Sequence, residues 1–167
     1  MARRRGPRGA SARIAAMSTQ PIIDEAALTD LSQARILLVD DNEQNLELMQ
    51  AYLEALPCTL STARDGVEAV AAIQREKPDL VLLDVMMPKM SGFEVCRKVK
   101  GDPSTRDIVI VMVTALHEVG DHERAVESGT DDFLTKPVNK LELVTRVRSL
   151  LRVALLKRKL AELLAGR

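Results

Sequence analysis

Segments typical of short strands and segments typical of helices alternate along this chain, and this alternation limits its fold more than any other feature. Apolar or β-favouring residues fill five short segments, at residues 36–39, 58–63, 80–83, 108–113 and 132–135. Between them, apolar residues such as Leu46, Met49 and Leu53 recur at spacings of three and four, which is the period of one helix face. Five strand–helix units in about 115 residues predict an α/β fold, with one parallel sheet covered by helices on both faces.

Capping residues mark several helix ends. Ser91, followed by Glu94 three residues later, has the pattern of a capping box at a helix start,. Gly129 stands where a helix ending near residue 128 needs a left-handed residue, and Asn139 is placed to cap the last helix,. These signals predict where the third, fourth and fifth helices begin or end.

In two helices, the spacing of apolar residues predicts which side chains face the core. After Asp65-Gly66, the core face is assigned to Val67, Val70 and Ile73. In the last helix, the residues that fit docking on the sheet are Leu141, Val144, Val147, Leu150 and Leu151. The apolar face then continues for more than three turns, through Leu155, Leu156, Leu160, Leu163 and Leu164. We expect residues 151–167 to form a helical extension that packs on a second copy, on a downstream domain, or back on its own domain.

The charge distribution excludes several function classes. Residues 1–17 hold five arginines and no acid, whereas the remainder has 19 basic and 24 acidic residues and sums to −5. The acidic body has the wrong sign for a nucleic-acid partner, and residues 1–33 are predicted to form a disordered basic leader and linker. No apolar run approaches the roughly 18 residues needed to cross a membrane, and the two cysteines form no CxxC pair,. We therefore expect a reduced, cytoplasmic protein.

Five polar side chains follow the predicted strands at the edge where ligands bind in open α/β sheets. They are Asp40 and Asp41 after the first strand, Asp84 after the third, Thr114 after the fourth and Lys136 after the fifth. Three converging carboxylates repel one another unless a cation neutralises them. Oxygen ligands without His or Cys favour Mg²⁺ or Mn²⁺. A lysine and a hydroxyl facing that metal complete a site for a phosphoryl group.

The residue types present exclude three other kinds of site. The loop after the first strand, residues 40–43, is acidic and lacks glycine, so it would repel a dinucleotide phosphate,. His117 and His122 lie five residues apart instead of the four that a zincin helix requires,. A phosphatase with an aspartyl nucleophile needs a second Asp two residues later, where this chain has Met86,. Asp84 is therefore predicted to accept a phosphoryl group and to release it slowly.

Four segments resemble the receiver domain of two-component response regulators. They are ILLVDDNEQN, DLVLLDVMMPKMSGFEVCRKVK, IVIVMVTA and DDFLTKPVNKLELVTRVRSLL, and the resemblance covers residues 34–150. It implies a flavodoxin-like, doubly wound (βα)₅ fold with strand order 2-1-3-4-5. The sequence of these core segments is also similar to that of receivers attached to diguanylate cyclases. Nothing in this sequence carries cyclase activity.

The resemblance also implies roles for single residues. Asp84 would be the phosphoacceptor for a sensor histidine kinase or phosphotransfer protein, catalysing only its own phosphorylation and slow dephosphorylation. The metal ligands would be Asp40, Asp41, Asp84 and the backbone carbonyl of Met86. Thr114 would hydrogen-bond the phosphoryl group and Lys136 would ion-pair with it. Phe133, three residues before Lys136, would be the switch aromatic, and the Lys136–Pro137 bond would be cis,.

The sequence is compatible with four hypotheses for the function of the chain. The chain can be a stand-alone receiver that binds an unidentified target or forms a homodimer, or the regulatory part of a multidomain enzyme such as a diguanylate cyclase. A third hypothesis is a scaffold that is never phosphorylated, and an unrelated phosphatase is a fourth. We also hypothesise that the apolar residues Met86 and Leu116 exclude the hydrolytic water and prolong the phosphorylated state.

Overall fold

The computed structural model describes residues 30–115 and 119–166, except for the side chains of residues 119–122. A short 3₁₀ turn, η1 (Leu31–Gln33), precedes alternating strands and helices. The strands are β1 (Arg35–Val39), β2 (Thr59–Ala63), β3 (Leu80–Asp84), β4 (Val109–Thr114) and β5 (Asp132–Thr135). The helices are α2 (Glu43–Leu53), α3 (Gly66–Glu76), α4 (Gly92–Gly101), α5 (Val119–Ser128) and α6 (Lys140–Ala165). Every predicted strand is present within one residue of its expected start or end.

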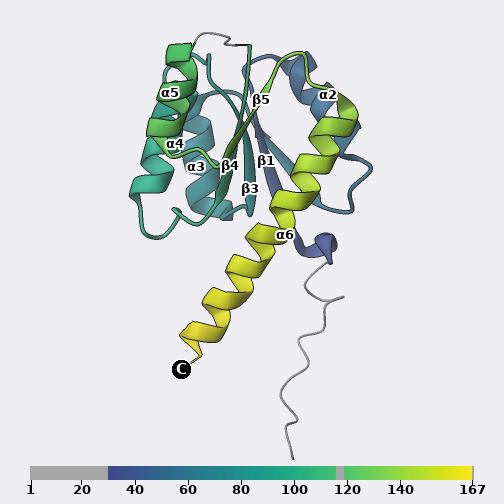
Figure 1. Cartoon of the computed structure of the whole chain (residues 1–167), viewed down its shortest axis with the longest axis vertical. Helices are drawn as coiled ribbons and strands as arrows, with labels where there is room; N and C mark the ends of the chain where they lie inside the picture. The colour runs from purple at the N-terminus through teal and green to yellow at the C-terminus, as the bar shows by residue number, and fades with distance from the viewer. Residues whose placement is uncertain (1–29, 116–118, 167) are drawn as a thin grey trace, which may run out of the picture.

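The five strands form one parallel sheet in the order β2-β1-β3-β4-β5. Helices α2 and α6 cover one face, and α3, α4 and α5 cover the other (Figure 1). Successive side chains of a strand point to opposite faces, so β1 contributes Ile36 and Leu38 to one core and Leu37 and Val39 to the other. Burial on both faces explains why the central strands are continuous apolar runs. The flavodoxin-like, doubly wound fold and its strand order are confirmed.

Side-chain caps begin the helices where the sequence predicts them. Ser91 accepts the backbone N–H of Glu94 at the start of α4, and Asn139 accepts that of Glu142 at the start of α6. Gly129, with φ of 90°, ends α5 in the left-handed conformation that glycine adopts without strain,. These capping residues predict the helix ends correctly because a cap involves only residues within one turn.

The predicted core faces of two helices need correction. In α3, Val67 is 52% exposed, and the buried residues are instead Gly66, Ala69, Ala72 and Ile73. A Cβ on Gly66 would overlap the carbonyl of Met90, so this close approach turns the glycine side of α3 inward. In α6, Leu141 is 75% exposed and Leu143 is buried. Leu143 shares its face with Val144, Val147 and Leu151, whereas Leu141 lies on the opposite side of the helix,.

Residues on both sides of the segment 34–150 also pack on the domain. Leu31 is buried in the core shared with α2 and α6, so the folded region begins before residue 34. Residues 1–29, which hold most of the predicted leader, lie outside the described residues. At the other end, Ala154 and Leu155 are still buried against the domain.

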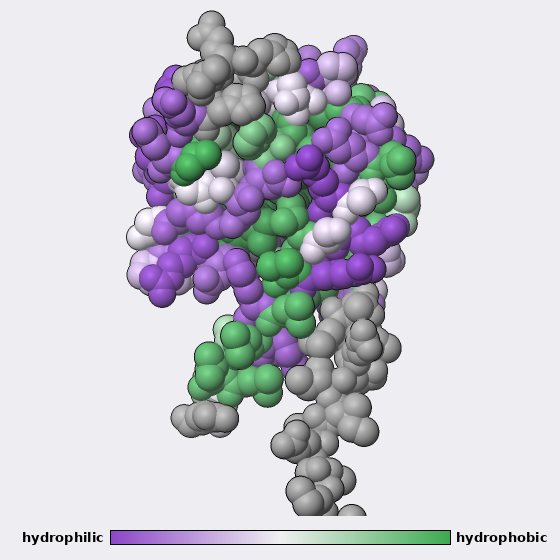
Figure 2. Space-filling view, in the orientation of Figure 1, coloured by the Kyte–Doolittle hydropathy of each residue, from purple (hydrophilic) through white to green (hydrophobic). Residues whose placement is uncertain are grey.

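The final turns of α6 project from the domain (Figure 1). Leu156, Leu160, Leu163 and Leu164 are each about half exposed, at 47–60%, and Figure 2 shows apolar surface on this projecting end. The chain's own domain therefore does not cover these four leucines. In the part of the chain that the structure describes, no helix combines the length and apolar character that a bilayer crossing requires.

Candidate functional site

Three carboxylates meet at the edge of the sheet where the parallel strands end. Asp40 follows β1, and Asp84 is the last residue of β3. The pairing of Val39 with Leu83 brings Asp40 alongside Asp84. One carboxylate oxygen from each of Asp40, Asp41 and Asp84 lies within 4.8 Å of the other two. The acidic cluster that the sequence predicts is present, with Asp40 and Asp84 buried and Asp41 exposed.

Lys136 brings a positive charge to this cluster from the loop after β5. Its Nζ lies 2.9 Å from Oδ2 of Asp40 and 3.3 Å from Oδ1 of Asp84. The backbone N–H of Lys136 donates a 2.8 Å hydrogen bond to the carbonyl of Thr114 at the end of β4. The Lys136–Pro137 peptide bond is cis, as the resemblance implied. The lysine thus contacts two carboxylates that are far apart in the sequence.

Two asparagines that the sequence analysis did not select also hold Asp40. The backbone N–H of Asn42 donates to Oδ1 of Asp40 at 2.9 Å, and the Asn45 side chain donates to Oδ2 at 3.2 Å. Asn42 is also the N-cap of α2, where its side chain accepts the N–H of Asn45. An asparagine before a helix is a capping signal, and that signal marks this region of the site.

Burial and charge set the protonation behaviour of the site. Burial raises the pKa of Asp84 to about 6, with Lys136 acting in the opposite direction and Asp40 and Asp41 adding to the rise. For Lys136, burial opposes the charge, but hydrogen bonds and charge from Asp40 and Asp84 outweigh it and raise its pKa. This environment disfavours the ionised form of the carboxylate when no cation is bound. A bound cation would offset that charge.

Thr114 and Phe133 lie on the neighbouring strands β4 and β5. Thr114 is 8% exposed and pairs with Thr135 across the two strands. Phe133 pairs with Met112, which is two residues before Thr114, and packs partly buried against the core under α3 and α4. The structure therefore brings Thr114 close to Lys136 and sets Phe133 on the adjoining strand.

The loop after Asp84, residues 85–91, packs closely on the end of β3. Val85 accepts the backbone N–H of Gly92 at 2.9 Å, and a Cβ on Gly92 would overlap the carbonyl oxygen of Asp84. Met86 is 67% exposed. Its side chain cannot transfer a proton. Leu116, His117 and His122 lie outside the residues whose side chains the structure describes.

An apolar cavity of about 470 Å³ opens beside the acidic cluster. Asp40 and Lys136 line its polar end, and α2 contributes Leu48, Met49 and Tyr52. Leu48 is 47% exposed, so part of this apolar surface faces solvent. The side of the acidic cluster that faces α2 is therefore partly apolar.

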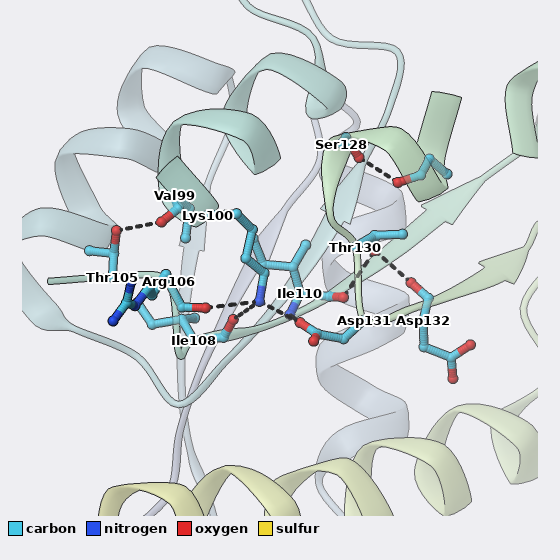
Figure 3. Close-up of polar contacts among 11 residues, drawn as sticks. Val99, Lys100, Thr105, Arg106, Ile108, Ile110, Ser128, Thr130, Asp131 and Asp132 are labelled. Atoms are coloured by element: carbon cyan, nitrogen blue, oxygen red, sulfur yellow. Dashed lines mark hydrogen bonds and ion pairs between the residues drawn. The ribbon is translucent and has the colours of Figure 1, made fainter. Parts of the chain in front are cut away.

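A second polar cluster serves the fold at the opposite edge of the sheet. Lys100 of α4 donates to the carbonyl of Ile108 and ion-pairs with Asp131, both at 2.7 Å (Figure 3). Asp131 also accepts the backbone N–H of Ile110 at 2.8 Å. Lys100 thus joins α4 to the starts of β4 and β5, away from the acidic cluster.

Comparison with known proteins assigns this arrangement to a family. The family model described as the response regulator receiver domain matches residues 36–148. The chain belongs to this family. Receiver domains are regulatory modules that generally bind Mg²⁺ at an acidic pocket and interact with histidine kinases or phosphotransfer proteins. Among the residues that the structure describes, Asp40, Asp41 and Asp84 form an acidic cluster that could hold such an ion.

Two curated response regulators illustrate the similarity. The chain is 54% identical over 122 residues to the response regulator PleD of Caulobacter vibrioides, a match that covers 73% of this chain and 27% of PleD. It is 41% identical over 118 residues to the DNA-binding dual master transcriptional regulator RpaA of Synechocystis, covering 71% of this chain and 49% of RpaA. The chain thus spans half or less of the length of these receiver-containing relatives.

Solved receiver structures share the fold. The signal receiver domain of a signal transduction histidine kinase from Syntrophus aciditrophicus aligns with a TM-score of 0.68 and 37% identity, covering 71% of this chain and 90% of that one. A CheY-like receiver domain protein from Methanospirillum hungatei aligns with a TM-score of 0.68 and 27% identity, covering 72% and 95%. Both alignments agree with the receiver architecture described above.

Proposed function

We propose that this chain is a phosphoacceptor switch in which Asp84 receives a phosphoryl group from a histidine kinase or a phosphotransfer protein. The observation that carries the proposal is the contact of Lys136 Nζ with both Asp40 and Asp84 inside the three-carboxylate cluster. Three carboxylates and one lysine at the ends of parallel strands form a site for a cation and a phosphoryl group together.

In the proposed reaction, an Oδ atom of Asp84 attacks the phosphorus of a phosphohistidine. A new P–O bond forms and the P–N bond breaks, with its electron pair remaining on the histidine nitrogen. Lys136, already 3.3 Å from Asp84, pairs with the charge of the transferred group,. The hydroxyl of Thr114 donates a hydrogen bond to a phosphoryl oxygen. The ionised form of Asp84 is the nucleophile, and Lys136 favours that form.

The donor atoms present fit Mg²⁺ or Mn²⁺. Asp40, Asp41 and Asp84 supply only oxygen, and no His or Cys joins the cluster among the residues that the structure describes,. We propose that these carboxylates and the backbone carbonyl of Met86 hold the ion. When bound, the ion supplies positive charge that offsets the carboxylates and the incoming phosphoryl group. Lys136 and the N–H of Asn42 orient Asp40 for this role.

Phosphorylation would then change the surface formed by α5, β5 and α6. The phosphoryl group adds about −1.5 to −2 of charge next to Thr114 and Lys136. Thr114 moves toward it, and Phe133 turns into the volume that Thr114 leaves. The pairing of Phe133 with Met112, two residues before Thr114, supports this coupling. The altered surface would bind a target protein or a second copy of the chain.

The first test is intact mass after incubation with acetyl phosphate and Mg²⁺, comparing the wild type with Asp84→Asn. We expect one phosphoryl adduct on the wild type and none on the variant. No adduct on either protein would overturn the proposal and favour a scaffold role. An adduct on both would show that another residue is the acceptor.

The lifetime of the phosphorylated state gives a second test. We propose that Met86 helps to exclude the hydrolytic water, and that Met86→Asn therefore shortens the half-life of the aspartyl phosphate. Met86 is 67% exposed, so it can reach only the outer side of the site. A half-life as long in Met86→Asn as in the wild type would contradict this role.

A second candidate function is the regulatory receiver of a longer output protein, such as a diguanylate cyclase. This candidate is supported by the 54% identity to PleD, because the match covers only 27% of the length of PleD. The projecting end of α6, with its exposed leucines, is a suitable connection to a following segment. Sequencing the gene beyond the codon for Arg167 tests this candidate directly, because a stop codon there would exclude it.

A further inference from the structure

A strained turn lies in the loop that follows Asp84. Lys89 has φ of 68°, in the left-handed region that residues with a side chain rarely adopt,. The backbone N–H of Met90 donates a 2.8 Å hydrogen bond to the carbonyl of Pro88 across this residue. A three-residue turn with a positive central φ is rare and strained. It persists only where surrounding contacts hold it, and such turns concentrate at functional sites.

One contact that holds this turn is an ion pair. Nζ of Lys89 lies 3.2 Å from Oδ2 of Asp65, whose side chain is 18% exposed. Glycine would adopt this backbone without strain, so a lysine here costs energy that its side chain offsets through Asp65. The pKa of Asp65 is lowered, first by the backbone N–H of Glu68 and then by Lys89. Asp65 therefore remains ionised and available to the lysine at neutral pH.

Asp65 divides its two oxygens between two tasks. Its Oδ1 accepts the backbone N–H of Glu68 at 2.8 Å and so caps α3, while Oδ2 holds Lys89. The next residue, Gly66, touches the backbone of Met90 so closely that no side chain fits between them. The start of α3 and the loop 85–91 thus meet through one backbone contact and one ion pair.

The loop is also fixed at its other end. Gly92 lies against the carbonyl of Asp84, and its N–H bonds to Val85. Between these two fixed ends stands Met86, whose carbonyl is a proposed Mg²⁺ ligand.

We infer that Asp65 is a positioning residue for the phosphoacceptor site. Through Lys89 it holds the strained turn of the β3–α4 loop, and thereby keeps the Met86 carbonyl in place for cation binding beside Asp84. The inference rests on the proposed function and adds a residue from α3 that lies outside the acidic cluster.

Three variants separate this role from capping and from general stability. Asp65→Asn keeps a good N-cap for α3 but removes the charge that holds Lys89. Lys89→Gln keeps a side chain on the strained residue but removes the charge of the tether, whereas Lys89→Arg keeps a positive charge within reach of Asp65. The matched control is Arg64→Gln, which removes an ion pair with Glu43 at the adjacent position, 2.8 Å long and exposed on both sides.

Two readouts are needed. The first is amide hydrogen exchange of residues 85–90 in the metal-free full-length protein, which does not depend on activity. The second is the Mg²⁺ concentration that half-saturates the amide chemical shifts of the same loop. For Asp65→Asn and Lys89→Gln we expect faster loop exchange and about 2- to 5-fold weaker Mg²⁺ binding, the range that one partly exposed ion pair supplies. Lys89→Arg and Arg64→Gln should match the wild type.

The outcomes are distinct. If loop exchange and Mg²⁺ binding in Asp65→Asn and Lys89→Gln equal those of the wild type, the positioning role is wrong and the proposed function stands. Faster exchange with unchanged Mg²⁺ binding would show that the Asp65–Lys89 ion pair is only a structural contact. That result would also overturn the inference. If the wild type binds no Mg²⁺ and forms no acetyl-phosphate adduct, the proposed function fails and the inference fails with it.

Discussion

Arg158 Nη1 lies 3.0 Å from Oδ1 and 3.2 Å from Oδ2 of Asp79, joining the projecting part of α6 to the start of β3. Asp79 is almost completely buried, with 5% of its side chain exposed, and its Oδ2 also accepts the backbone N–H of Arg35. Because Leu155 is the last buried leucine of α6, this ion pair fixes the direction of the helix where apolar packing ends.

Arg158→Ala should lower the free energy of unfolding by about 1–3 kcal/mol, because it leaves a buried carboxylate with a single backbone donor. Urea denaturation should show a lower midpoint with an unchanged slope. Arg152→Ala, at an exposed position one and a half turns earlier, is the control and should change stability by less than about 0.5 kcal/mol. Equal losses in the two variants would contradict the role of Asp79.

Asp84→Asn should stabilise the metal-free protein at neutral pH. The pKa of Asp84 is raised from 3.8 to about 6, so the folded state disfavours the ionised carboxylate. A shift of this size corresponds to a stabilisation on the order of 1–3 kcal/mol when the charge is removed.

The pH dependence follows from the sign of this shift. Between the unfolded pKa of 3.8 and the folded pKa of about 6, the folded state binds more protons, so this group makes the wild type more stable as pH falls through that range. Asp84→Asn lacks this contribution, and its advantage should shrink from pH 7 to pH 4. A stability difference that does not depend on pH would show that charge is not the cause.

Gly92→Ala should destabilise the protein by about 1–3 kcal/mol, because its Cβ would overlap the carbonyl of Asp84 in a packed region,. Gly101→Ala is the matched control, since nothing lies within 4 Å of its Cβ position in the last turn of α4. The thermal midpoint of each variant measures the effect. Similar midpoints for the two would disprove the close approach at Gly92.

Leu48→Glu should slow phosphorylation by a protein donor while leaving the acetyl-phosphate reaction nearly unchanged. Leu48 lines the apolar cavity beside Asp40 and Lys136 and is 47% exposed, so a protein donor would bury it and a small donor would not. We expect a loss of at least about tenfold with any phosphohistidine protein that phosphorylates the wild type, because burying a charge is costly. Val67→Glu, on the exposed side of α3, should affect neither reaction, and equal rates for Leu48→Glu and the wild type would exclude this surface as the docking side.

Local patterns determined much of this protein from the sequence alone. The strand Ile36–Val39 was predictable because a strand buried on both faces must be apolar throughout. Its position also placed Asp40 at the ligand-binding edge. The caps at Ser91 and Asn139 were predictable because a cap involves only the first turn of its own helix,.

Tertiary packing decided the rest. Val67 and Leu141 were assigned to the core, yet both are exposed, because the rotation of a helix on the sheet depends on contacts with other elements, such as Gly66 against Met90. The pairs Asp79–Arg158 and Asp65–Lys89 join residues 79 and 24 positions apart. The raised pKa of Asp84 likewise comes from burial and from charges on other loops. A sequence specifies which residues end each strand, but only the folded chain sets the distances between them, and distance and burial govern electrostatic interactions.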